Sequence, residues 1–170
     1  MKQVIIYGEL HTREERERVE RLIRMDNRAA PFDYILSEEA GNNILDTPDK
    51  LRRAIKERNY AIGPGSYELA LKFGIPCIGI DVWDDKIHQL DRKDKDGMYL
   101  DCSYSFAVRE KQMLSVICGY AERGRCAVLL GDSHIRTKPN RVMGPASIIY
   151  TTLRDTPSVI FVRSPIAEAE

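Results

Sequence analysis

The sequence lacks the short motifs that identify several large enzyme classes. It contains no Gly-x-x-x-x-Gly-Lys-Ser/Thr loop for nucleotide phosphates, no Gly-x-Gly-x-x-Gly fingerprint for dinucleotides and no Gly-x-Ser-x-Gly elbow for a nucleophilic serine. The sequence therefore gives no support for a P-loop nucleotide hydrolase, a dinucleotide-dependent enzyme or an elbow-type serine hydrolase. Any chemistry must come from other polar residues.

Long apolar runs and an excess of charge of one sign are also absent. No run approaches the about 20 apolar residues that a membrane-spanning helix needs. The apolar run near the N-terminus turns polar at Glu9, so it is too short for the core of a signal peptide. Because 26 basic and 26 acidic residues give a formal net charge of zero, neither nucleic acid nor a membrane is expected as the main partner. We expect a cytoplasmic protein with a small-molecule or peptide substrate.

Cysteine is scarce and is not spaced for metal binding. The chain has four cysteines, and no two of them form a Cys-x-x-Cys pair. Cys77 and Cys126 lie within apolar runs that resemble buried strands. We therefore expect buried, reduced thiols instead of disulfides or a zinc site.

The apolar residues that are present occur in short continuous runs. A chain of 170 residues with 43% hydrophobic content is expected to form a single α/β domain spanning residues 1–170. Five runs predict strands, at residues 3–8, 33–38, 75–81, 125–132 and 158–163. Because these runs do not alternate with polar residues, they indicate a mainly parallel sheet of about five strands with helices on both faces.

Helices are predicted between these strands. Thr12 and Glu15 form a Thr-x-x-Glu capping box, which predicts a helix directly after His11 with a charged, solvated outer face. Further helices are predicted at residues 49–58, 66–72, 103–123 and 144–154, with Ser66 as a cap. The highly charged residues 84–97 are predicted to form a loop, a type of segment that often covers a site as a lid.

Acidic residues and histidines follow four of the predicted strands. The side chains are Glu9 and His11, then Glu38 and Glu39, then Asp81, then Asp132 and His134. An acid in such a position is often only a helix cap, which is the preferred interpretation for Asp81 or Asp132 taken alone. However, ligands of open α/β sheets bind outside the carboxyl ends of the strands. The repeated spacings Gly8-x-x-His11 and Gly131-x-x-His134 therefore predict one shared site, with both imidazoles partly exposed.

Two chemistries are open to this set of side chains. His11, Glu38 and His134 could ligate a divalent metal such as Mn, Zn or Co, which would activate water. Alternatively, one histidine could act as a general base on water without a metal, oriented by a carboxylate.

The motifs Gly8-Glu9-Leu10-His11-Thr12, Glu38-Glu39 and Leu130-Gly131-Asp132-Ser133-His134 occur in a recognisable order. Together they resemble the superfamily of TraB, TIKI, erythromycin-esterase-like and ChaN-like proteins, and Arg109-Glu110 resembles its arginine–acid element on a long helix. The resemblance covers the chain from Gly8 to His134. It implies that Glu9, His11, His134 and one of Glu38 and Glu39 are site residues.

The resemblance also implies a range of functions. TIKI proteins resemble metal-dependent proteases, erythromycin esterases hydrolyse a lactone, and ChaN-like proteins bind haem. We therefore predict a hydrolase that cleaves an ester, lactone or peptide bond with a His/Glu site. The alternative is a non-catalytic binding protein that holds a small ligand, haem or a metal in the same pocket. A degenerate interaction module is disfavoured, because a solvated structural loop has no need of these residues.

By the same resemblance, Arg109 would orient a carboxylate or bind an anionic group of the substrate. Phe106 and Met113 lie three residues before it and four after it, so the three share one helical face. A buried guanidinium needs a carboxylate, which predicts that Arg109 pairs with a strand-end acid, either Glu38 or Glu39 or Asp81. The competing interpretation is a surface salt bridge.

Overall fold

The protein is described from a computed structural model that covers residues 1–57, 65–82 and 84–167. Its core is a six-stranded sheet with the order β3-β4-β2-β7-β1-β8. The strands are β1 (Val4–Glu9), β2 (Tyr34–Ser37), β3 (Ile44–Leu45), β4 (Cys77–Gly79), β7 (Cys126–Gly131) and β8 (Val159–Val162). All neighbouring pairs are parallel except β3 and β4. The predicted parallel α/β sheet is confirmed, with β3 as a short additional edge strand.

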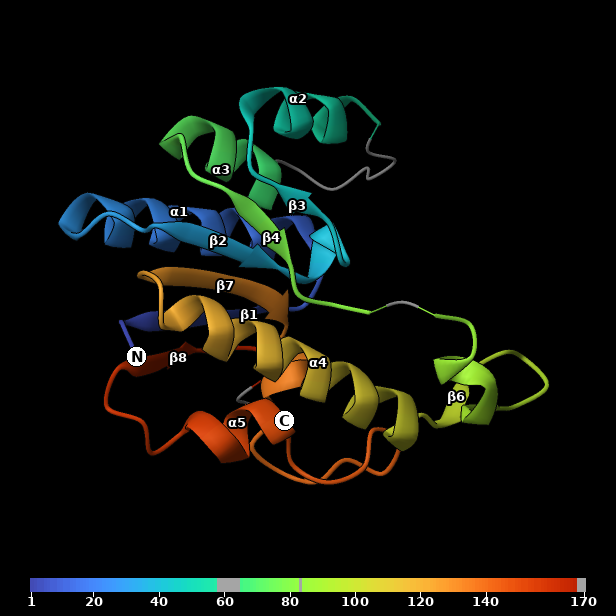
Figure 1. The fold of residues 1–170 in the computed structure, drawn as a ribbon. Coiled ribbons are helices and arrows are strands. Elements are labelled where there is room, and N and C mark those ends of the chain that lie inside the picture. The colour runs from blue at the N-terminus through green and yellow to red at the C-terminus, as the bar shows by residue number, and fades with distance from the viewer. Residues whose placement is uncertain (58–64, 83, 168–170) are drawn as a thin grey trace.

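Helices cover both faces of this sheet, as Figure 1 shows. Helices α1 (Arg13–Ala29), α2 (Pro48–Glu57) and α3 (Ser66–Phe73) lie over one face, whereas α4 (Ser103–Ala121) and α5 (Ile148–Leu153) lie over the other. Successive side chains of β1 alternate between two cores: Val4 and Ile6 pack toward α4, and Ile5 and Tyr7 pack toward α1. Each central strand is therefore apolar up to its carboxyl end, which explains the continuous apolar runs.

The strand register aligns the ends from which the predicted site residues project. Glu9, the last residue of β1, pairs with Gly131, the last residue of β7. Ser37 at the end of β2 pairs with Leu129 of β7 on one side and with Gly79 of β4 on the other. The segments that follow these strands consequently start at one edge of the sheet.

The charged segment differs from its prediction. Residues 84–97 are not an irregular loop, because they contain the 3-10 helix η2 (Ile87–Leu90) and strand β5 (Arg92–Lys93), which pairs antiparallel with β6 (Tyr99–Asp101). Asp91 Oδ2 accepts a hydrogen bond from Ser105 Oγ of α4 at 2.9 Å and lies 2.8 Å from His88 Nδ1. These contacts order the segment beside the N-terminal end of α4 (Figure 1).

Two helix starts also differ in detail. Thr12 Oγ1 accepts a hydrogen bond from the Glu15 backbone at 3.3 Å, but the Glu15 carboxylate pairs with Arg18, so we see only half of the expected capping box. Gly65, and not Ser66, caps α3, and its N–H donates to Glu68 Oε2 at 2.9 Å. The hydroxyl of Ser66 is therefore available for the site described below.

Two general features complete the fold. All four cysteines are free thiols, and three of them are buried. Within the residues that the structure describes, none of the helices has both the length and the apolar character needed to cross a membrane.

Candidate functional site

A cavity of about 310 Å³ lies at the carboxyl edge of the sheet, between α1, α3 and the strand ends. Five of the six predicted catalytic residues line it, namely Glu9, His11, Glu38, Glu39 and Arg109. Asp81 also lines it, whereas His134 does not. The prediction that side chains at the strand ends share one site is thus correct for most of these residues. Their catalytic roles remain predictions.

Glu9 and His11 form a carboxylate–imidazole pair at the mouth of the cavity. Glu9 is buried, and its Oε1 accepts a hydrogen bond from Arg16 Nη2 of α1 at 2.7 Å and lies 3.3 Å from His11 Nδ1. The hydrogen bond with Glu9 raises the pKa of His11 above its ordinary value. Burial opposes ionisation of Glu9, yet hydrogen bonds from His11 and Arg16 outweigh it and lower the pKa of Glu9.

The conformation of His11 is unusual for a residue with a side chain. Its φ is 53°, in the left-handed region that L-residues rarely adopt. The imidazole is 58% exposed, so burial of this side chain does not drive the conformation. A non-glycine residue held in this region at a cavity is consistent with a functional constraint.

Glu38 begins the 3-10 helix η1 (Glu38–Ala40), directly after β2, and is fully engaged. Its Oε2 accepts a hydrogen bond from the backbone N–H of Gly131 at 2.7 Å, and its Oε1 accepts one from Arg109 Nη2 at 2.7 Å. His134 Nε2 lies 3.4 Å from the same Oε1. Burial alone would raise the pKa of Glu38, but His134, the Gly131 amide and Arg109 hold it well below its usual range. Glu38 is therefore an ionised carboxylate.

Glu39 lines the same cavity but is held by other elements. Its Oε2 accepts a hydrogen bond from Ser66 Oγ of α3 at 2.9 Å, and Ser66 Oγ in turn accepts from Ser37 Oγ at 2.8 Å. Its Oε1 lies 3.5 Å from Arg16 Nη1. The sequence left open which of the two glutamates faces the site. Both do, with Glu38 held toward β7 and α4 and Glu39 held toward α1 and α3.

Arg109 is buried on the inward face of α4, as predicted. Its Nε donates to Asp81 Oδ1 at 2.9 Å and its Nη2 to Asp81 Oδ2 at 2.7 Å, which makes a bidentate pair. The same Nη2 reaches Glu38. The prediction that Arg109 pairs with a strand-end acid is confirmed for Asp81 and Glu38. Asp81 is thus more than the helix cap suggested by its position alone.

His134 lies deeper than the sequence predicted. It belongs to the 3-10 helix η3 (Asp132–Ile135), is 2% exposed and stacks on Phe106 with ring centroids 4.7 Å apart. Its Nε2 faces Glu38, and its Nδ1 lies 3.6 Å from Glu110 Oε1. The predicted partial exposure is wrong for His134, because η3 turns its ring under α4, away from the cavity. Burial opposes the charge, but Glu110 and Glu38 raise the pKa of His134.

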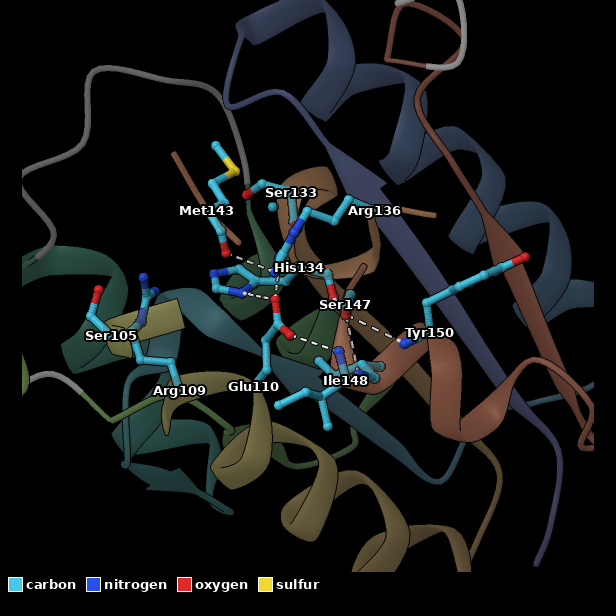
Figure 2. Close-up of polar contacts among 12 residues, drawn as sticks. Ser105, Arg109, Glu110, Ser133, His134, Arg136, Met143, Ser147, Ile148 and Tyr150 are labelled. Carbon is cyan, nitrogen blue, oxygen red and sulfur yellow. Dashed lines mark hydrogen bonds and ion pairs between the residues drawn. The ribbon is translucent and has the colours of Figure 1, made fainter. Parts of the chain in front are cut away.

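Glu110 is a partner that the sequence analysis did not assign to the site. It is 0% exposed. Its Oε1 accepts a hydrogen bond from Arg136 Nη1 at 2.5 Å, and its Oε2 accepts one from the backbone N–H of Ile148 at 2.8 Å. Figure 2 shows it between His134, Arg136 and the first residue of α5. The spacing of Glu110 could have indicated its burial. Met113 and Ile117 follow it by three and seven residues, so Glu110 lies on their apolar helical stripe.

Helix α1 also contributes residues that the sequence assigned to a solvated face. Arg16 and Glu20 line the cavity together with Val19. The spacing of Arg16, Val19, Glu20 and Ile23 is that of one helical stripe, and Val19 and Ile23 are fully packed in the core. The charged character of Arg16 and Glu20 concealed their inward position.

Asp132 has a structural role, but it is not the helix cap that its position suggested, because η3 has no side-chain cap hydrogen bond. Its carboxylate accepts hydrogen bonds from Arg163 and from the backbone N–H of Ser164 at 2.9 Å, which fixes the segment after β8. A Cβ at Gly8 would collide with Asp132 Oδ1 and lie 2.8 Å from Ile135 Cδ1. Gly8 is therefore needed so that β1 can approach η3 closely.

Gly131 is needed at the site itself, which gives a testable prediction. A Cβ there would lie 2.8 Å from His11 Nε2. In Gly131→Ala we expect the exposed imidazole to swing away, with a change in unfolding free energy below about 1 kcal/mol, because surface side chains adjust readily. The NMR-monitored pKa of His11 should fall toward its ordinary value as contact with Glu9 is lost. An unchanged titration would show that Gly131 does not constrain His11.

The predicted metal ligands do not fit a divalent cation in this arrangement. Among residues 1–57, 65–82 and 84–167, no three His, Cys, Asp or Glu side chains gather closely enough to hold a metal. Glu38, the carboxylate among the three predicted ligands, has one oxygen on the Arg109 guanidinium and the other on the Gly131 amide. A guanidinium 2.7 Å from the would-be ligand oxygen repels a second cation.

The chain matches no protein-family model, no curated protein and no solved structure. The resemblance to the TraB, TIKI, erythromycin-esterase-like and ChaN-like proteins therefore rests on the motifs alone and stays a hypothesis. Function is accordingly inferred from the geometry of the cavity.

Proposed function

We propose that the protein is a metal-independent hydrolase that cleaves an ester, lactone or peptide bond, with His11 as the general base. The observation that carries this proposal is the Glu9–His11 pair at the mouth of the cavity, in which Glu9 Oε1 faces His11 Nδ1 at 3.3 Å. Carboxylates in this position fix the tautomer and orientation of catalytic imidazoles.

The proposed reaction begins with water next to His11. With the Nδ1 proton donated to Glu9, the lone pair of Nε2 accepts a proton from water while the water oxygen attacks the carbonyl carbon. The tetrahedral intermediate then collapses, the C–O or C–N bond breaks, and the imidazolium returns the proton to the leaving group. Arg16 contacts the same Glu9 oxygen at 2.7 Å. We assign to its guanidinium the role of stabilising the negative charge that develops on the carbonyl oxygen.

The remaining residues act as positioning groups in this proposal. Asp81 fixes Arg109, Arg109 fixes Glu38, and Glu38 holds the Gly131 amide beside His11. His134 lies behind Glu38 and is assigned the role of holding that carboxylate in place. The four free thiols are in keeping with a cytoplasmic setting, which we include in the proposal.

An ester, lactone and peptide hydrolysis panel on the purified protein tests the proposal. His11→Ala should lower kcat/KM by about 100- to 10,000-fold, the range that general base catalysis contributes. His88→Ala is the matched control, because His88 pairs with Asp91 outside the cavity, and its activity should be unchanged. A chelator should have no effect. Full activity in His11→Ala would rule out His11 as the base.

The pH dependence provides an independent readout of the same pair. His11 acts as a base only when neutral, so kcat/KM should fall as pH falls through its pKa, at a midpoint above the ordinary value of 6.5. Glu9→Gln removes the carboxylate that raises this pKa, so the midpoint should move to lower pH. Binding of a ligand that depends on His11, without turnover, would instead support the alternative of a non-catalytic binding protein.

A further inference from the structure

The wall of the cavity formed by α1 contains an incompletely paired acid. Glu20 is 6% exposed and lines the cavity beside Arg16 and Val19. Within residues 1–57, 65–82 and 84–167, its Oε1 is buried without a hydrogen-bond partner, and its Oε2 accepts a hydrogen bond from Arg24 Nη2 at 3.2 Å. Arg24 is 29% exposed on its side chain, and its own Nη1 is buried without a hydrogen-bond partner among the described residues, so the Glu20–Arg24 pair is joined by a single hydrogen bond. Glu20 therefore has one carboxyl oxygen in the wall that lacks a hydrogen-bond donor among the described residues.

The guanidiniums that line the cavity are bound mainly by carboxylates other than Glu20, whose ion-pair partner is Arg24. The described residues that line the cavity include five carboxylates, Glu9, Glu20, Glu38, Glu39 and Asp81, and two guanidiniums, Arg16 and Arg109. Arg109 is bound to Asp81 and Glu38. Arg16 lies between Glu9 and Glu39. Both guanidiniums are therefore already engaged by carboxylates other than Glu20.

An incompletely paired buried carboxylate carries a free-energy cost that a bound cation would offset. Burial raises the pKa of Glu20, which reflects this cost. The same cavity contains apolar surface from Val19, Leu129 and Leu130. A ligand with a positive group and a short apolar stretch matches these two features.

We infer that the cavity selects substrates carrying an ammonium or guanidinium group, which Glu20 binds while an attached ester or amide carbonyl lies at His11. The placement of the carbonyl at His11 rests on the proposed function, whereas the binding of a cation by Glu20 does not. An anionic substrate would meet an excess of carboxylates and should be rejected.

Unreactive probes test the charge preference without any turnover. We would titrate the protein calorimetrically with n-butylguanidinium, n-butanol and butyrate. A charge-assisted hydrogen bond to Glu20 should make the guanidinium bind at least about tenfold more tightly than either other probe. This comparison uses the wild-type protein, so it does not depend on the folding of a variant. Equal affinities for the three probes would overturn the inference.

Glu20→Gln then locates the binding group. The variant should lose about tenfold in affinity for n-butylguanidinium and should bind n-butanol as before. Glu17→Gln is the matched control, because Glu17 lies on the same helix, is 44% exposed on its side chain and pairs with Arg13 outside the cavity. Its affinity for n-butylguanidinium should be unchanged. Equal losses in the two variants would show that Glu20 is not the binding group.

Paired esters separate this inference from the proposed hydrolysis. The phenyl esters of 6-aminohexanoate and of hexanoate differ only in the terminal ammonium group, and the former should have the higher kcat/KM, by about tenfold, in the wild type but not in Glu20→Gln. Selective binding of n-butylguanidinium with hydrolysis of neither ester would reject the hydrolase and keep the cation site. Hydrolysis of both esters at equal rates would keep the hydrolase and reject the cation preference.

Discussion

Replacing Glu110 with alanine is expected to lower the free energy of unfolding by about 3–5 kcal/mol, the cost of breaking a buried ion pair by removing one partner. The substitution leaves Arg136 Nη1 and the Ile148 N–H without their carboxylate acceptor, in a position that is 0% exposed. It also removes the carboxylate next to His134 Nδ1. Urea denaturation followed by circular dichroism measures the change.

The neighbouring residue provides the control for this prediction. Lys111 is exposed on the same helix, so Lys111→Ala should change the unfolding free energy by less than about 0.5 kcal/mol. Similar small losses in the two variants would show that the carboxylate of Glu110 does not hold α5 and η3 against α4.

Arg109→Ala is the second substitution with a large expected effect, again about 3–5 kcal/mol of unfolding free energy. It leaves the buried carboxylate of Asp81 and the half-buried carboxylate of Glu38 without the guanidinium that contacts both. Because Glu38 holds the Gly131 amide next to His11, hydrolysis should fall as well. Denaturation and kcat/KM on a folded sample give the two readouts.

Arg109→Lys distinguishes charge from geometry at this position. Lysine keeps the charge but loses the planar fork that binds both oxygens of Asp81, so we expect an intermediate loss of about 1.5–3 kcal/mol. Arg53→Ala, at an exposed position of α2, should be neutral. An Arg109→Lys protein with unchanged stability and activity would contradict the role assigned to the bidentate pair.

The fold was predictable because burial on both faces of a parallel sheet leaves a simple pattern. Five runs do not alternate with polar residues, and each forms a strand of the parallel sheet, around Ile5, Ile35, Ile78, Val128 and Ile160. The edge strand β3 was missed because it has two residues and follows a glycine–asparagine turn signal. The β5–β6 hairpin was missed because its order comes from polar contacts such as Asp91 with Ser105, which have no periodic signature.

The sequence predicted which residues lie at the strand ends of the site, but it did not predict how deeply individual side chains are buried. Glu9, Glu38 and Asp81 follow buried strands, so topology alone brings them to one edge. The depth of His134 depends on how η3 turns toward Phe106, which no local pattern encodes. Glu20 and Glu110 were missed because a charged residue on a helix is normally solvated, and only its spacing relative to apolar neighbours signals otherwise.

The contacts of Glu38 have a consequence for the order of folding. This one carboxylate joins residues 71 positions away, at Arg109, and 93 positions away, at Gly131. Contacts between residues so distant along the chain form slowly, because the intervening segment must be closed into a loop before they are gained. A nascent or partly refolded chain can therefore contain α1 before β7 has docked, but β1 still lacks its strand partners β7 and β8, and the cavity is not assembled. Competence for ligand binding should accordingly appear only with the last steps of sheet assembly.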